Sequence, residues 1–208
     1  NMKTEIIPVI HMVNTNQVMT NIKICLNAGI KKVFLINHHV DIDALLDCAL
    51  NVKTLHPELW VGVNLLGESA QDAIKRDLEL DGLWCDQSIT PEYAKQNRKF
   101  KGMLFGGLAF KYQPQPADLE EACKEAALTT DVATTSGAAT AKAADISKIL
   151  AIHEYLDGHP MAIASGVSAN NILSYKGLVD YLLVASSITS RSEMIYEDKL
   201  IELLELLK

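Results

Sequence analysis

Eight short apolar runs, each followed by an amphipathic segment, recur along the chain and constrain its fold more than any other feature. In 208 residues they give an average spacing of about 26 residues per unit. The runs are rich in Val, Ile, Leu and Phe without clean polar alternation, which is typical of parallel strands covered on both faces. We expect strands at residues 6–13, 32–37, 59–66, 82–86, 102–111, 131–135, 161–164 and 179–185.

Helix start and stop signals separate these runs. Asp41, Ser69 and Asp118 precede apolar residues at helical spacing, where N-caps belong, and Pro91 suits a first helical turn. Segment 193–208, in which apolar pairs alternate with acidic residues, predicts a closing helix. Glycines just after helical patterns predict left-handed caps at Gly29, Gly102, Gly158 and Gly177.

The series predicts an α/β fold, a single (β/α)8 TIM barrel with short loops and one domain over residues 1–208. The rival is an open doubly wound sheet, which usually has five or six strands and a Gly-rich turn after the first. Here the first strand is followed by Asn14 and Thr15 without a glycine, which favours the barrel. Asn1 precedes Met2, so we expect Asn1 to be a cloning remnant.

Composition excludes several classes of function. No stretch approaches 18 uninterrupted apolar residues, so we expect no membrane insertion, and no secretory signal pattern is present. The net charge of −7 and a pI near 5.3 argue against nucleic acid as a partner. Four cysteines without CxxC spacing predict reduced, buried thiols in a cytoplasmic protein: Cys25, Cys48, Cys85 and Cys123.

Polar residues follow the expected strands at their carboxyl ends, where barrels carry active sites. Asn37 and Asn64 are expected to orient a polar ligand there. The stretch 134–142, which includes Ser136 and Gly137, is built from small and hydroxylated residues. It predicts a mobile loop that wraps a sugar or phosphate, with a plain flexible connection as the alternative.

Residues 165–171 carry the sharpest local signal. A glycine follows an apolar strand directly and Ser168 precedes a short helical pattern, so the exposed N–H groups of Gly166, Val167 and Ser168 predict a phosphate site beside Ser165. Strand eight adds Ser186 but no glycine. The alternative is a tight turn that needs a glycine and a cap.

Asp86 and Lys111 are expected to end neighbouring strands, which lie about 4.8 Å apart. We predict an ion pair that keeps both groups charged. A charged Lys111 suits stabilisation of an anionic intermediate better than Schiff-base chemistry, which needs a neutral amine, and Asp86 suits acid–base catalysis. The alternative is a purely structural ion pair at the barrel rim.

His38 and His39, followed by Asp41 and Asp43, suggest a metal site. Adjacent side chains of an extended chain point to opposite faces, however, and neither HxH nor HExxH spacing occurs. We therefore expect no metal and no cofactor. The remaining metal hypothesis is a weak site that combines His11 with one of the two neighbouring histidines.

The order of motifs resembles the BtpA family, TIM barrels named for a role in photosystem I biogenesis. The matching segments are Pro-Val-Ile-His-Met-Val at 8–13, Gly-Val-Asn-Leu-Leu at 62–66, Ala-Phe-Lys at 109–111, Ser-Gly-Ala-Ala-Thr at 136–140 and Ser-Gly-Val-Ser-Ala-Asn-Asn-Ile at 165–172. The chain departs from the family at Tyr112, where histidine is usual, at Ala141, where glycine is usual, and at Ala185-Ser186, where Gly-Thr is usual. The family's Leu-Pro-Gly loop is also absent, so the resemblance implies a divergent member.

Two functions follow from these features. The first is an enzyme acting on a small phosphorylated metabolite, such as a sugar or ribosyl phosphate, by lyase, isomerase or nucleosidase-type chemistry with Asp86 and Lys111 as catalytic residues. The second, which the resemblance implies, is a non-catalytic ligand-binding or assembly factor. The apolar pairs of residues 200–207 either cover the barrel or join a second copy in a homo-oligomer.

Overall fold

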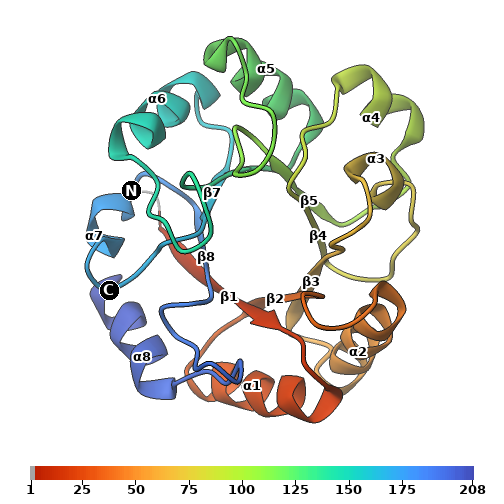
Figure 1. Cartoon of the computed structure of the whole chain (residues 1–208), viewed down its shortest axis with the longest axis vertical. Coiled ribbons are helices and arrows are strands. Elements are labelled where there is room, and N and C mark those ends of the chain that lie inside the picture. The colour runs from red at the N-terminus through yellow and green to blue at the C-terminus, as the bar shows by residue number, and fades with distance from the viewer. Residues whose placement is uncertain (1–2) are drawn as a thin grey trace.

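Eight parallel strands pair in chain order, and the first pairs with the last to close a barrel (Figure 1). This closed order of parallel strands confirms the predicted (β/α)8 barrel. The computed structural model describes residues 3–208, so Asn1, the expected cloning remnant, lies outside the described residues. The strands are β1 (Glu5–His11), β2 (Lys32–Ile36), β3 (Trp60–Asn64), β4 (Gly82–Cys85), β5 (Met103–Gly107), β6 (Val132–Thr135), β7 (Met161–Ala164) and β8 (Tyr181–Val184).

A helix follows each strand and packs outside the barrel (Figure 1). The predicted N-caps are confirmed, because the side chains of Asp41, Ser69 and Asp118 each accept a hydrogen bond from the backbone N–H three residues on. Pro91 opens its helix as expected. The helices are α1 (Thr15–Asn27), α2 (Ile42–Leu55), α3 (Ala70–Ala73), α4 (Pro91–Asn97), α5 (Leu119–Thr129), α6 (Ile146–Leu156), α7 (Ile172–Tyr175) and α8 (Glu197–Leu206).

Two local predictions are wrong. Strand β5 ends at Gly107 rather than at residue 111, because Ala109 and Tyr112 adopt left-handed conformations, with φ of 47° and 62°, that a strand cannot continue through. Gly102 is not left-handed, unlike Gly29, Gly158 and Gly177. Its backbone instead approaches the carbonyl of Asp81 so closely that no side chain would fit.

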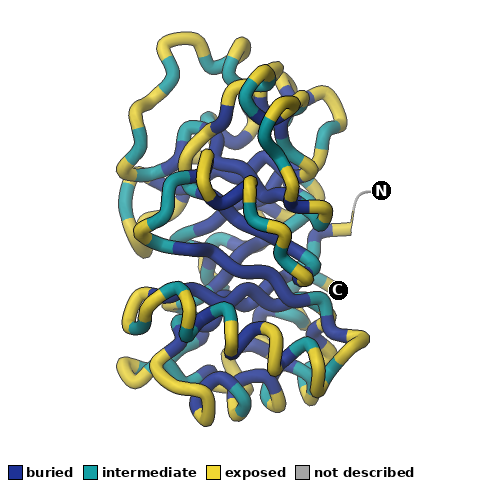
Figure 2. Tube along the Cα trace, turned by 90° about the vertical axis from the view of Figure 1, so that its right-hand side faces the viewer, coloured by how far each residue is buried: buried dark blue, intermediate teal, exposed yellow. Residues whose placement is uncertain are grey.

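The apolar residues form two cores. One lies between the strands and the helices, and the other fills the barrel itself; Figure 2 shows the buried strands crossing the middle of the molecule. Inside the barrel the ring of Phe34 makes edge contacts with Trp60, Trp84 and Phe105 at 5.1–5.6 Å between ring centroids. These edge-to-face rings belong to the apolar core that fills the barrel.

The described residues also bear on the compartment predictions. Between residues 3 and 208, no helix has the length and apolar character needed to cross a membrane. The four cysteines are buried and free, as predicted. Burial raises the pKa of the Cys25 and Cys85 thiols to about 12, so these thiols are protonated at neutral pH and weakly reactive.

Candidate active site

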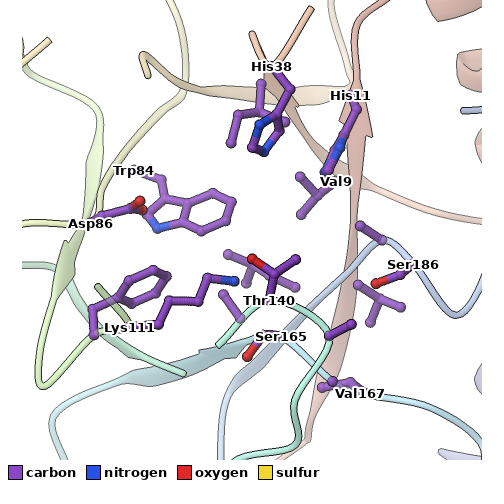
Figure 3. Close-up of a pocket in the computed structure, with 18 of the residues that line it drawn as sticks. Val9, His11, His38, Trp84, Asp86, Lys111, Thr140, Ser165, Val167 and Ser186 are labelled. Atoms are coloured by element: carbon purple, nitrogen blue, oxygen red, sulfur yellow. The ribbon is translucent and has the colours of Figure 1, made fainter. Parts of the chain in front are cut away.

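A cavity of about 210 Å³ opens at the carboxyl-terminal mouth of the barrel (Figure 3). Its floor is apolar, and its walls carry ionisable side chains from the ends of β1, β2 and β4 and from the loop after β5. The floor includes Val9, Ile36, Trp84, Phe110, Ala164 and Leu183, and the ionisable residues are His11, His38, Asp86 and Lys111. Polar groups on an apolar floor are the usual construction of a small-molecule site.

Asp86 directly follows β4 and stands in the cavity wall. Asn64, buried at the end of β3, donates a hydrogen bond from Nδ2 to Asp86 Oδ1 at 3.0 Å. Burial raises the pKa of Asp86 above its usual value, although the Asn64 hydrogen bond and the charge of Lys111 oppose the rise. Asn64 thus acts on the orientation and acidity of Asp86; it does not line this cavity.

Lys111 reaches the cavity from the loop after β5 rather than from the strand end. Its backbone N–H donates to Ser136 Oγ at 2.8 Å, and its Nζ lies 5.6 Å from the centroid of the Phe110 ring. Figure 3 shows the side chain extending into the cavity with its nitrogen toward the middle. Burial lowers the pKa of Lys111, while the charges of Asp86 and Tyr112 oppose this shift.

The predicted ion pair between Asp86 and Lys111 is wrong. Among the salt bridges of residues 3–208, none joins these two side chains. Their pKa values move in the directions set by burial, upward for Asp86 and downward for Lys111, which are opposite to those of a tight ion pair. Desolvation therefore outweighs their mutual attraction.

Two histidines form another side of the cavity. His11 ends β1 and His38 follows β2, with ring centroids 4.6 Å apart. Burial, followed by the nearby positive charges of His38, His39 and Lys111, lowers the pKa of His11 to about 4, so its ring is neutral at pH 7. Glu193 approaches His11 at 3.6 Å and His39 at 3.7 Å. Within the described chain no group of three or more His, Cys, Asp or Glu side chains is arranged to hold a metal ion.

The loop after β7 differs from the expected capped turn. Helix α7 begins only at Ile172, and Ser168 is not its cap; the Ser168 N–H donates to Asn171 Oδ1 at 2.9 Å. Gly166 has a φ of 66°, and a Cβ atom there would collide with the backbone of residues 142–143. Glycine is therefore required for the chain to pass this close. The N–H groups of Gly166 and Val167 make no hydrogen bond within residues 3–208.

The loop after β8 continues this edge of the cavity. Ser187 Oγ donates to the carbonyl oxygen of Val167 at 2.6 Å, which ties the two loops together. The side chain of Ser186 is exposed and lines the cavity. In the part of the chain that the structure describes, the N–H groups of Ser186 and Ser187 are also without a partner. Three residues of these two adjacent loops that line the cavity, Gly166, Val167 and Ser186, therefore have unused backbone donors.

The small-residue loop after β6 covers one side of the cavity, where Thr140 and Ala141 line it. Two of its backbone donors are used, because the Gly137 N–H donates to Ser165 Oγ at 3.0 Å and the Thr140 N–H to the Tyr112 hydroxyl at 3.0 Å. The loop is thus tied to the loops after β5 and β7. The N–H group of Ala141, which lines the cavity, makes no hydrogen bond within residues 3–208.

Six of the predicted site residues line the cavity and five lie behind it. Those in the lining are Asp86, Lys111, Ser165, Gly166, Val167 and Ser186. Asn37 instead exchanges two hydrogen bonds with the backbone of Leu66, at 2.7 and 3.0 Å, and so holds the loop after β3. Four further predicted residues also hold neighbouring groups in place through hydrogen bonds: Asn64, Ser136, Gly137 and Ser168.

Three lining residues lie outside the predicted set of catalytic and binding residues. His11 and His38 belong to the polar series at the strand ends, but the only specific role that the sequence suggests for them is a weak metal site. For Trp84 the sequence predicts packing rather than contact with a ligand. Its side chain packs against Phe34 and Phe110 and also lines the cavity, and among the described residues its buried Nε1 has no hydrogen-bond partner.

The fold and the cavity define a (β/α)8 barrel with a ligand-sized polar site at its carboxyl-terminal mouth. No protein-family model matches the chain, and neither does any curated protein sequence. Solved barrels do match in structure. A phosphoribosyl anthranilate isomerase from Thermus thermophilus has a TM-score of 0.68 and 13% identity, covering 99% of this chain and 98% of that chain.

Two further structures carry bound molecules. A phosphoribosyl anthranilate isomerase in complex with reduced 1-(o-carboxyphenylamino)-1-deoxyribulose 5-phosphate has a TM-score of 0.67 and 11% identity, covering 100% of this chain and 98% of its own. A KDPG aldolase from Legionella pneumophila, with pyruvate captured at low pH as a covalent carbinolamine intermediate, has a TM-score of 0.63 and 13% identity over 97% of this chain and 91% of its own. Identities this low show the fold alone.

Proposed function

We propose that the protein is an enzyme acting on a small phosphorylated metabolite by lyase, isomerase or nucleosidase-type chemistry. One observation carries the proposal: a single cavity joins an edge of unpartnered backbone N–H groups to a carboxyl group and an amine whose pKa values burial shifts toward neutrality. The first feature suits an anionic group of a ligand, and the second suits acid–base catalysis near neutral pH.

In this proposal the phosphate lies against the loops after β7 and β8. The N–H groups of Gly166, Val167 and Ser186 are its donors, and α7 is too short to contribute as a helix end. The apolar floor receives the rest of the ligand. Asp86 then faces the reacting carbon or oxygen as an acid–base group that Asn64 holds in place.

The comparisons support the substrate class without carrying it. A barrel of the same fold holds a compound named as a 5-phosphate, and a sugar or ribosyl phosphate is small enough for a cavity of about 210 Å³. The BtpA resemblance belongs to this proposal too, with a non-catalytic ligand-binding or assembly factor as its alternative. We also retain the predictions of a cytoplasmic location and of a homo-oligomer.

A thermal-shift series against sugar phosphates, nucleotides and inorganic phosphate tests the phosphate site. A ligand at 100 times its Kd adds about 2.7 kcal/mol of stability, which for a chain of this size raises Tm by roughly 5–10 °C. Ser186→Asp places a negative charge at the cavity edge and should abolish the shift. Ser174→Asp, an exposed serine on α7, is the matched control and should keep it.

Gly166→Asp would be a poor choice of variant, because any side chain at Gly166 collides with the backbone of the neighbouring loop and disturbs folding. If no phosphorylated compound shifts Tm, or if Ser186→Asp leaves the shift unchanged, the phosphate site is wrong. A ligand that binds but is never converted by the wild-type protein would support the assembly factor over the enzyme.

A further inference from the structure

Two half-buried lysines of this barrel have very different surroundings. Lys148 Nζ donates hydrogen bonds to the carbonyl oxygens of Ala109 and Ser136, at 2.8 and 2.9 Å, and so links the ends of β5 and β6. Lys111 Nζ has no hydrogen-bond acceptor and no salt-bridge partner among residues 3–208, and it extends into the cavity (Figure 3). The amine of Lys148 is therefore used in hydrogen bonds that hold the fold together, whereas the amine of Lys111 is free to react.

The wall around Lys111 disfavours its charged form. Phe110 and Trp84 line the same cavity, and no carboxylate of the described residues comes within salt-bridge distance to hold an ammonium ion. Burial lowers the pKa of the amine, and this effect outweighs the charges of Asp86 and Tyr112, which favour the ammonium form. An amine desolvated in an apolar pocket is the usual form of a nucleophilic lysine.

We propose that the amine of Lys111 condenses with the carbonyl group of the substrate, so that the ligand class is a small ketone, aldehyde or 2-oxo acid. This inference rests on the proposed function, since it names the reacting group of the same site. The sequence argued against such chemistry only because it expected an ion pair with Asp86, and that ion pair does not form.

The condensation balances with the groups present in the cavity. The Nζ lone pair forms a bond to the carbonyl carbon while the C=O π electrons move to oxygen, and a proton passes from nitrogen to that oxygen to give a carbinolamine. The protonated carboxyl of Asp86 then donates its proton to the hydroxyl, which leaves as water and yields an iminium ion and the Asp86 carboxylate. The raised pKa of Asp86 keeps a fraction of it in the protonated form that this step needs.

Reductive trapping tests the inference directly. The wild-type protein is incubated at neutral pH with pyruvate or with dihydroxyacetone phosphate, sodium borohydride is added, and the modified lysine is mapped by peptide mass spectrometry. We expect a reduced adduct on Lys111 and none on Lys148, whose nitrogen is bound to two carbonyls. In Lys111→Arg, which keeps a positive charge but has no primary amine, the adduct should be lost while Tm confirms that the barrel is folded.

The two probes separate this inference from the phosphate site. A pyruvate adduct on Lys111 without any Tm shift by phosphates would support the nucleophilic lysine and contradict the proposed phosphate site. A phosphate-dependent Tm shift with no adduct on Lys111 from either probe would overturn the inference and leave the proposed function standing. Labelling of Lys111 no stronger than that of the exposed Lys124 would overturn it as well.

Discussion

The substitution Gly107→Ala tests whether the end of β5 sets the position of Asp86. A Cβ atom at Gly107 would overlap the backbone carbonyl of Asp86, at the point where β4 and β5 run side by side. A carbonyl in a strand-end loop cannot rotate away as a side chain does. The backbone at Asp86 must therefore move, and its carboxyl group moves with it, away from Asn64.

The loss of stability depends on the kind of atom that the new Cβ atom would overlap. Overpacking a buried site costs about 1–3 kcal/mol, and a rigid backbone oxygen places Gly107→Ala near the upper end of that range. Because 1 kcal/mol corresponds to about 2–4 °C for a chain of this length, Tm should fall by roughly 6–12 °C. Any activity of the site should fall as well, because the Asn64–Asp86 hydrogen bond is broken.

The neighbouring Gly106 supplies the matched control. A Cβ atom there meets the Cγ2 methyl of Thr130, a side chain that can rotate at the expense of hydrogen bonds worth about 1 kcal/mol. Differential scanning calorimetry should therefore show a Tm loss of roughly 2–4 °C for Gly106→Ala. Thr130→Ser, which removes the methyl group, should restore the Tm of the Gly106→Ala variant but not that of the Gly107→Ala variant. Equal losses at both glycines, or rescue of both, would refute the reasoning.

Two further predictions concern ionisation in the cavity. Asn64→Leu removes the donor to Asp86 Oδ1, so the pKa of Asp86 should rise further, as read from its ¹³Cγ NMR titration; an unchanged or lower pKa would contradict the role of Asn64. Because the folded-state pKa of Asp86 lies above the unfolded value of about 3.9 in the wild-type protein and further above it in this variant, the free energy of unfolding should decrease as pH rises through the folded-state pKa. Glu193→Gln should lower the pKa of His38, since the carboxylate favours the imidazolium form. Proton NMR of the histidine ring checks this, and an unchanged pKa would show that Glu193 does not act on His38.

Much of the barrel could be predicted because each strand and each helix start depends on residues close together in the sequence. Parallel strands covered on both faces need continuous apolar runs, and the caps at Asp41, Ser69 and Asp118 act within three residues of their own position. The wrong end of β5 is also local in origin. Apolar residues at 108–110 extend the pattern of β5 past Gly107, yet the left-handed turn at Ala109 sends that segment over the mouth of the barrel.

The amino-acid pattern alone was enough to predict the eightfold series, the end of the barrel that carries polar residues, and six of the residues that line the cavity. The charge state of those residues depends on the folded structure. The order of elements brings Asp86 and Lys111 to one cavity, but burial depends on the summed packing of all eight strands and their loops, which no local pattern encodes. For that reason the ion pair expected from strand adjacency gave way to a carboxyl and an amine that desolvation moves toward their neutral forms.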